Sequence, residues 1–195
     1  MDLLQATEYP TVRLTQNYQL LTSLYRDNWI VQNIVATIPN DIIRKWYELR
    51  SNISPEQVDQ MKKLERKTQI RKKLLLGMYW GRLYGGAVGV ILVKGQDDMS
   101  QPLELEAVMP GSFMGLQVFD RWSGVYPDSE LVTDPENPDF GLPAYYTVRD
   151  EETGCTAARV HHSRIIRFIG RELPYIEQIT EQYWGESELE AIYSE

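Results

Sequence analysis

The sequence has few of the residues on which cysteine or histidine chemistry depends. It contains one cysteine, Cys155, and two histidines, His161 and His162. A single cysteine excludes an intrachain disulfide and a cysteine-built metal site, and it fits folding in a reducing cytosol. The histidines are neighbours in a predicted strand, where adjacent side chains point to opposite faces, so we do not expect them to share a metal ion.

Long hydrophobic runs are also missing. The longest apolar stretches lie around 74–80 and 85–93, well below the roughly 20 residues that a membrane-spanning helix requires. The N-terminal segment carries Asp2 and Glu8 and does not form the basic, apolar leader of a secreted protein. We therefore expect no membrane partner. Because 43% of the residues are apolar, the chain can bury one core, and we expect a single domain over 1–195.

Positive charge is scarce in the second half of the chain. Residues 1–96 contain 14 basic and 8 acidic side chains, whereas residues 97–195 contain 6 basic and 20 acidic ones, giving a net charge of −8. A monomer can satisfy this division by packing a basic face near acidic loops. A head-to-tail ring of copies can also satisfy it, because such an interface joins two different patches.

Helical periodicity dominates the N-terminal part. Apolar residues at helical spacing predict one or two helices over 17–38. Pro39 is expected to interrupt them, and Asn40 or Asp41 can cap a short turn that runs through Trp46.

The clearest local signal is a helix start. Ser54 as N-cap, Pro55 at the first helical position and Gln57 three residues after the cap predict a capping box. The apolar pattern that follows predicts a long helix with a possible break near 67–69 and an end by Gly85.

Glycines recur at the end of that helix. Gly77, Gly81 and Gly85 are spaced by four residues, so they share a helical face and let another backbone approach. Gly85 and Gly86 are expected to let the chain leave the helix and enter a sheet. The segment lacks the Lys-Ser/Thr of a phosphate loop. It also runs from helix to strand, which is the reverse of a phosphate loop or a dinucleotide-binding motif. We therefore expect no nucleotide and no other cofactor.

After Gly85 the period changes to that of strands. Residues 94–98 and 150–154 are predicted to form hairpin turns, and 126–143, with five acids and four prolines, a long irregular loop. A helix over 186–193 completes the chain. The expected strands, about six in number, cover 87–93, 103–108, 116–119, 145–148, 157–161 and 165–169.

The order of elements predicts an α+β fold: N-terminal helices including one long helix, an antiparallel sheet of about six strands, and a short C-terminal helix. The helical part covers about 15–85, the β-rich part about 86–170, and an acidic C-terminal helix lies within about 175–195.

No catalytic, cofactor-binding or metal-binding residue is expected. Ser112 and Ser163 lack a nucleophile elbow. Cys155 lies beside acids in the sequence, which would raise the pKa of its thiol and make it a poor nucleophile. The acidic segment 134–139 departs from the calcium-loop template through its prolines and the late position of Gly141. We therefore expect a protein that is not an enzyme.

One segment concentrates positive charge. Lys63, Lys67 and Arg71 are spaced by four residues and would share a helical face. DNA or phosphate binding, a solvated face and a subunit contact are all compatible with such a stripe. The segment has no interleaved aromatic residues or groove-reading motif, and residues 172–195 hold seven acids and no base, so a subunit contact is favoured. The residues of this predicted contact are Lys62, Lys63, Arg66, Lys67, Arg71, Lys72 and Lys73.

Short motifs from about Tyr18 to Glu190 carry a family resemblance. They include Trp80 to Ala87, Val160 to Phe168 and Trp184 to Ser187. Their residues are Pro39, Asp41, Arg44, Trp46, Trp80, Arg82, Tyr84, Gly85, Gly86, His161, Ser163, Arg164, Pro174, Trp184 and Gly185. In order and spacing they resemble the tailed-bacteriophage portal family, whose N-terminal domain also occurs in anti-CBASS proteins.

The resemblance implies the N-terminal, wing-region domain of a portal protein. Such proteins form dodecameric rings at a capsid vertex, contact terminase, capsid and connector proteins, and pass double-stranded DNA non-specifically through their channel. The expected location is the virion, and the host cytoplasm during assembly. Family members continue into stem and clip regions, which we expect this chain to lack.

Two other functions remain open. One is a non-catalytic N-terminal module of a phage anti-CBASS protein, and the other is an acidic interaction or adaptor domain. His161-His162-Ser163 matches the H-x-S/T motif of two-histidine phosphodiesterases, which are fused to relatives of this domain. Such enzymes need two copies of the motif, one His as acid and one as base, and this sequence has one. Ser163 and Arg164 are therefore predicted to fix a strand edge or a subunit contact.

Overall fold

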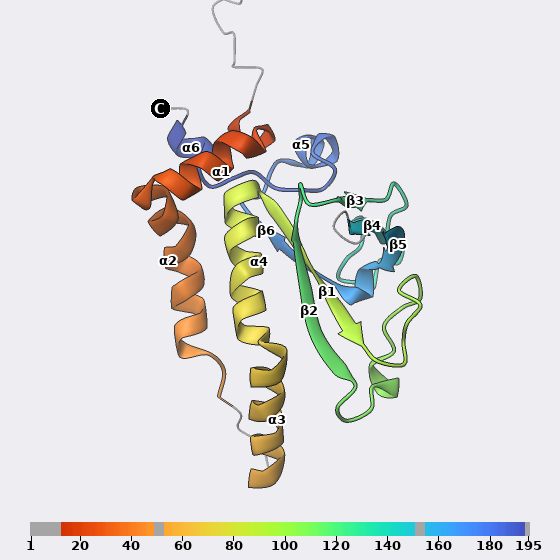
Figure 1. Ribbon diagram of the computed structural model, residues 1–195. Coiled ribbons are helices and arrows are strands. Elements are labelled where there is room, and N and C mark those ends of the chain that lie inside the picture. Colours follow the sequence, from red (N-terminus) through yellow and green to blue (C-terminus); the bar gives the residue numbers. More distant parts are fainter. Residues whose placement is uncertain (1–12, 49–52, 151–154, 194–195) are drawn as a thin grey trace, which may run out of the picture.

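Helices precede strands in the computed structural model, which describes residues 13–48, 53–150 and 155–193 (Figure 1). The α-helices are α1 (Tyr18–Asp27), α2 (Trp29–Lys45), α3 (Pro55–Thr68), α4 (Ile70–Tyr84), α5 (Tyr175–Thr180) and α6 (Glu190–Tyr193). The strands are β1 (Gly86–Val93), β2 (Phe113–Asp120), β3 (Val125–Pro127), β4 (Tyr145–Asp150), β5 (Cys155–His161) and β6 (Ile165–Ile169). This order confirms the predicted α+β class.

The strands form two antiparallel sheets of three strands each, ordered β2-β1-β6 and β3-β4-β5. Helix α4 packs on the first sheet and lies between that sheet and α2 (Figure 1). The core between the sheets contains Val88, Val90, Val125, Tyr146, Val148, Val160 and Trp184. A second core among the helices contains Leu14, Leu21, Val31, Val35, Leu83 and Leu189.

Pro39 does not interrupt the helix, contrary to the prediction. It lies buried inside α2, which continues to Lys45. A proline inside a helix costs about 3 kcal/mol through a lost hydrogen bond and a clash with the preceding turn. Burial of Val31, Val35 and Ile43 along the same helix outweighs that cost. The side chain of Arg82 also donates to the Ile34 carbonyl at 3.1 Å, near the disturbed turn.

The start and the break of the next helix are confirmed. Ser54 and Gln57 form the predicted capping box at the start of α3. Gln69, with φ 51° and ψ 32°, separates α3 from α4 in the left-handed region. Gly85, with φ 82°, ends α4, and Gly86 opens β1.

One predicted strand is wrong and one was missed. Residues 103–108 form irregular chain with a 3-10 turn over Leu105–Ala107, and Leu105 is 74% exposed. Their alternating pattern therefore lacks the buried face that would stabilise a strand. The missed strand is β3, which overlaps the start of the segment predicted as an irregular loop and pairs with β4.

The two predicted hairpin turns differ in outcome. Strands β1 and β2 pair, but the chain between them runs from 94 to 112, so the turn at 94–98 does not join two paired strands directly. Strands β4 and β5 pair as a hairpin. The residues 151–154 of its turn lie outside the described part of the chain.

The C-terminal region contains two short helices, α5 and α6, where one helix was predicted. Gln182 and Tyr183, with φ of 54° and 64°, leave the right-handed helical region between them. Trp184 and Gly185 then bring the chain back against Gly86 and Gly85. The segment between the two helices therefore packs against the end of α4.

Candidate interaction groove

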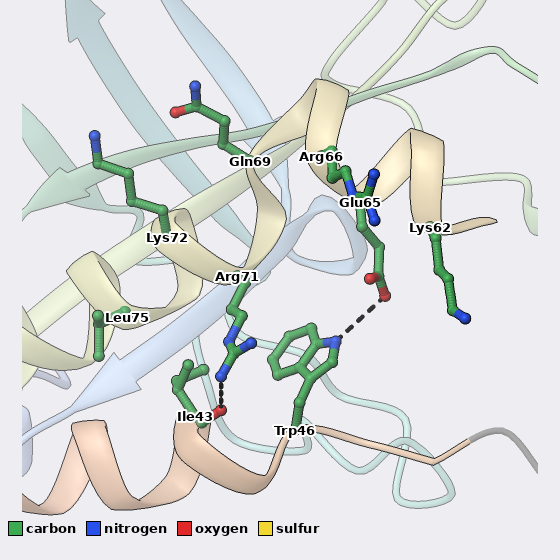
Figure 2. Close-up of a pocket in the computed structure, with 9 residues that line it drawn as sticks. All are labelled: Ile43, Trp46, Lys62, Glu65, Arg66, Gln69, Arg71, Lys72 and Leu75. Carbon is green, nitrogen blue, oxygen red and sulfur yellow. Dashed lines mark hydrogen bonds between the residues drawn. The ribbon is translucent and has the colours of Figure 1, made fainter. Parts of the chain in front are cut away.

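A groove of about 550 Å³ lies between the C-terminal end of α2 and the α3–α4 junction (Figure 2). The surface exposed inside it is mainly apolar, because Ile43, Leu75 and the Trp46 indole contribute to its wall. The aliphatic stems of lysine and arginine side chains can extend such a surface. The volume falls in the range of typical ligand pockets. The lining residues are Ile43, Trp46, Lys62, Glu65, Arg66, Gln69, Arg71, Lys72 and Leu75.

Trp46 occupies the centre of the groove. It caps the C-terminus of α2 with φ 44° and ψ −167°, a backbone conformation that is costly for a residue with a side chain. Its indole Nε1 donates to Glu65 Oε1 at 3.3 Å. The Tyr47 hydroxyl donates to the same carboxylate, and this hydrogen bond, together with burial, raises the pKa of Tyr47. Glu65 therefore ties the chain after α2 to α3.

Arg71 closes the other side of the indole. Its Nη2 donates to the Ile43 carbonyl at 2.6 Å, and its guanidinium lies 5.7 Å from the centroid of the Trp46 ring. Figure 2 shows the two side chains next to each other, reaching from opposite walls. Arg71 thus binds one of the unpaired carbonyls at the end of α2 and makes a cation–π contact.

The positive residues of the predicted contact differ in whether they line the groove. Lys62, Arg66, Arg71 and Lys72 line the groove, whereas Lys63 and Lys67 do not. Gln69, in the left-handed region, separates α3, which carries Lys63 and Lys67, from α4, which carries Arg71. Lys73 also lies outside the groove and is partly buried.

The cations on the groove rim are available to a partner. Lys62, Arg66 and Lys72 are exposed. Within the described ranges, none of these three forms an ion pair. A second hollow of about 400 Å³ shares Trp46, Lys62 and Glu65 with the groove and extends it toward Val58 and Met61.

The acidic C-terminal stretch is used largely within its own chain. Glu181 and Arg121 form a buried pair at 2.9 Å, with each side chain 7% exposed. Further contacts join Glu177 to Arg13, Glu188 to Arg82, and the Glu190 carboxylate to the backbone of Leu14 and Thr15. Less negative charge is therefore available to a neighbour than the sequence predicted.

The histidine motif lies where β5 ends. The His161 and His162 rings lie 4.4 Å apart instead of on opposite faces, because the chain leaves β5 at His161 and enters a 3-10 turn. Burial, with the charges of His162 and Arg164, lowers the pKa of His161. His162 Nδ1 lies 2.8 Å from an Asp139 carboxylate oxygen.

Ser163 and Arg164 hold the segment that follows β1. The Ser163 hydroxyl accepts from the Leu103 amide at 2.8 Å. Arg164 is 2% exposed and donates to the carbonyls of Gln101 at 2.7 Å and Gln96 at 3.2 Å. This geometry supports the predicted structural role at a strand edge.

Among the other residues of the predicted pattern, the tryptophans pack within the fold and the Asp41–Arg44 pair lies at the surface. Trp184 is 3% exposed, and Trp46 and Trp80 are partly buried, so all three tryptophans are at least half buried as predicted. Trp80 lies 5.8 Å from Tyr84 by ring centroids. Asp41 and Arg44 form an exposed pair at 3.5 Å, and Pro174 precedes α5.

Two features of the protein surface were not predicted from the sequence. Ile43 and Glu65 line the groove, but no motif in the sequence marked either residue as part of a site. The apolar face of α5 was missed as well, although Tyr175, Ile176 and Ile179 have the spacing of one helical face.

Neither a metal centre nor a membrane span was found in the described residues. No three His, Cys, Asp or Glu side chains among residues 13–48, 53–150 and 155–193 are grouped to hold a metal ion. No helix of that part is both long and apolar enough to cross a bilayer.

A family model described as phage portal protein matches residues 19–195. The chain belongs to this family. An anti-CBASS protein Acb1 from Caulobacter sp. (strain RHG1) is 30% identical over 177 residues, 89% of this chain and 27% of that protein. An uncharacterized protein from Haemophilus influenzae is 30% identical over 180 residues, 92% of this chain and 38% of that protein. An anti-CBASS protein Acb1 from Sphingomonas paeninsulae is 29% identical over 170 residues, 86% of this chain and 26% of that protein.

The portal family match covers both the helices and the sheets described above. The chain spans between 26% and 38% of the length of these three relatives.

Proposed function

We propose that this domain is a structural, non-catalytic component of the phage portal vertex, the head-tail connector ring used in DNA packaging and ejection. The observation that carries this proposal is the groove around Trp46, an open surface with an apolar wall and a cationic rim that suits a macromolecular partner. Membership of the portal family supports the same role.

In this role the domain contacts other portal subunits in a ring, dodecameric as the resemblance implies. Terminase, capsid and connector proteins are its further partners. Double-stranded DNA passes through the ring without sequence-specific contacts. The protein is then part of the virion after assembly in the host cytoplasm.

The test is to tag the protein in the phage or prophage that encodes it and to purify particles. The expected result is a tagged ring at one vertex, seen by electron microscopy, in particles that package DNA. Finding the protein in the lysate but never in particles would contradict the proposal.

A second candidate is a non-catalytic module of an anti-CBASS protein, because two of the relatives carry that name. The two candidates differ in what accompanies the domain. Stem and clip segments in the flanking reading frame favour the portal role, and a domain with a second H-x-S/T motif favours the antidefence role.

Both candidates predict that this domain is not an enzyme. Purified protein should neither hydrolyse ATP nor cleave cyclic oligonucleotides. Metal-independent turnover that disappears in His161→Ala or His162→Ala would contradict both.

A further inference from the structure

Helix α5 exposes an apolar face that the described parts of the chain do not cover. Tyr175 is 72% exposed, Ile176 is 78% exposed and Ile179 is 46% exposed. Ile179 lies three residues after Ile176 and four after Tyr175, which are the spacings of neighbouring side chains on a helix. Three large apolar side chains gathered on one exposed face are typical of a protein interaction site.

The groove around Trp46 has the complementary character. Its wall is mainly apolar, and Lys62, Arg66 and Lys72 surround it with exposed positive charge. Glu172, exposed just before α5, and Glu177 on α5, which pairs with Arg13, place carboxylates beside the apolar face, and the neighbouring Arg171 is an exposed cation. A helix with an apolar face and a neighbouring carboxylate thus fits a groove with an apolar wall and a cationic rim.

The two surfaces lie too far apart to meet within one molecule. In Figure 1 α5 lies near the upper end of the protein, and α3 forms the lower end. We propose that the groove of one copy receives α5 of a second copy. This inference rests on the proposed portal function, and it names the two surfaces through which subunits meet.

The apolar contact provides most of the stabilisation in this arrangement. Exposed ion pairs contribute only about 0–1 kcal/mol each, so the rim cations chiefly set the orientation of the incoming helix. Because groove and helix are different patches, each copy uses both and the contact repeats head to tail. Such an interface closes into a ring or grows into a filament.

The test uses two variants of the 195-residue chain, each altered at one surface. Ile176→Asp places a charge in the apolar face of α5, and Lys62→Glu with Lys72→Glu reverses two of the three cations on the rim of the groove. Both sets of positions are exposed, so circular dichroism and unfolding midpoints should match those of the wild type. Met109→Asp, at a position 73% exposed and outside both surfaces, is the matched control.

Sedimentation at increasing concentration should show wild-type and control protein forming oligomers, and each interface variant associating about tenfold more weakly, equivalent to ~1.4 kcal/mol. An equimolar mixture of the two interface variants should form dimers and nothing larger, because it retains one intact groove and one intact α5. No other pairing of surfaces predicts that result.

Three outcomes would overturn the inference. They are a wild type that stays monomeric at every concentration, variants that associate like the control, and a variant mixture that stays monomeric. If the groove variant instead loses binding to duplex DNA while its mass is unchanged, the groove is a nucleic-acid contact. The tagged-particle experiment is independent, since a virion protein can lack this contact and a self-associating domain can be absent from particles.

Discussion

Gly85 and Gly185, which are a hundred residues apart in the sequence, are in backbone contact. The Gly185 amide donates to the Gly85 carbonyl at 3.0 Å, and the Gly170 amide donates to the same oxygen at 3.2 Å. A Cβ on Gly85 would collide with the Gly185 carbonyl. The end of α4, the end of β6 and the segment before α6 therefore meet at one point of the backbone.

Gly85→Ala is expected to destabilise the protein by at least ~2 kcal/mol, because a left-handed conformation and a backbone collision act together. Gly95→Ala is the matched control. Gly95 has φ 89°, but a Cβ there would meet nothing within 4 Å. Urea unfolding measures both. Equal losses in the two variants would contradict a tight contact at Gly85.

Trp184→Ala is expected to cost about 3–5 kcal/mol, because a large side chain that is 3% exposed leaves a cavity between the sheets. Trp80→Ala should cost less, since Trp80 is only partly buried beside Tyr84. The free energies of unfolding of the two variants provide the comparison. A larger loss at Trp80 than at Trp184 would contradict the described packing.

Arg164→Met is expected to loosen the segment between β1 and β2. The substitution removes the donors from the partly buried carbonyls of Gln96 and Gln101, and each lost hydrogen bond should cost about 0.5–1.5 kcal/mol. Hydrogen exchange should accelerate in residues 94–103 more than in α1. Uniform acceleration along the chain would instead indicate global destabilisation.

The Glu181–Arg121 pair predicts a pH dependence of stability. Burial alone would raise the pKa of Glu181, but hydrogen bonds from Arg121 and Gln16 and the charge of Arg121 outweigh it, so the pKa is lowered. The unfolded chain therefore binds this proton more readily. The stabilisation is complete above the unfolded value of about 4.3 and is lost as pH falls through the lower folded value.

Glu181→Gln measures that contribution directly. The wild type should be more stable than the variant near neutral pH, and the difference should shrink as the pH falls below about 4. Urea unfolding at several pH values checks this. A difference that is constant with pH would mean that the Glu181 charge does not contribute.

Features specified within a few residues could be predicted from the sequence. The capping box at Ser54 and the exit from α4 through Gly85 both form as expected, because cap hydrogen bonds and positive φ are satisfied locally. The strand that the alternating pattern at 103–108 predicted did not form, for the opposite reason. A strand needs a pairing partner, and the local pattern does not say whether one is present.

The sequence by itself determined the α+β order, the concentration of positive charge around α3 and the scarcity of groups for metal or thiol chemistry. Only the tertiary structure decided that α2 continues through Pro39, that Lys62 and Lys72 border one groove while Lys63 does not, and that Glu181 binds Arg121. These outcomes depend on contacts between residues far apart in the chain. The burial and electrostatic energies of such contacts exceed local preferences, and residue order alone does not reveal them.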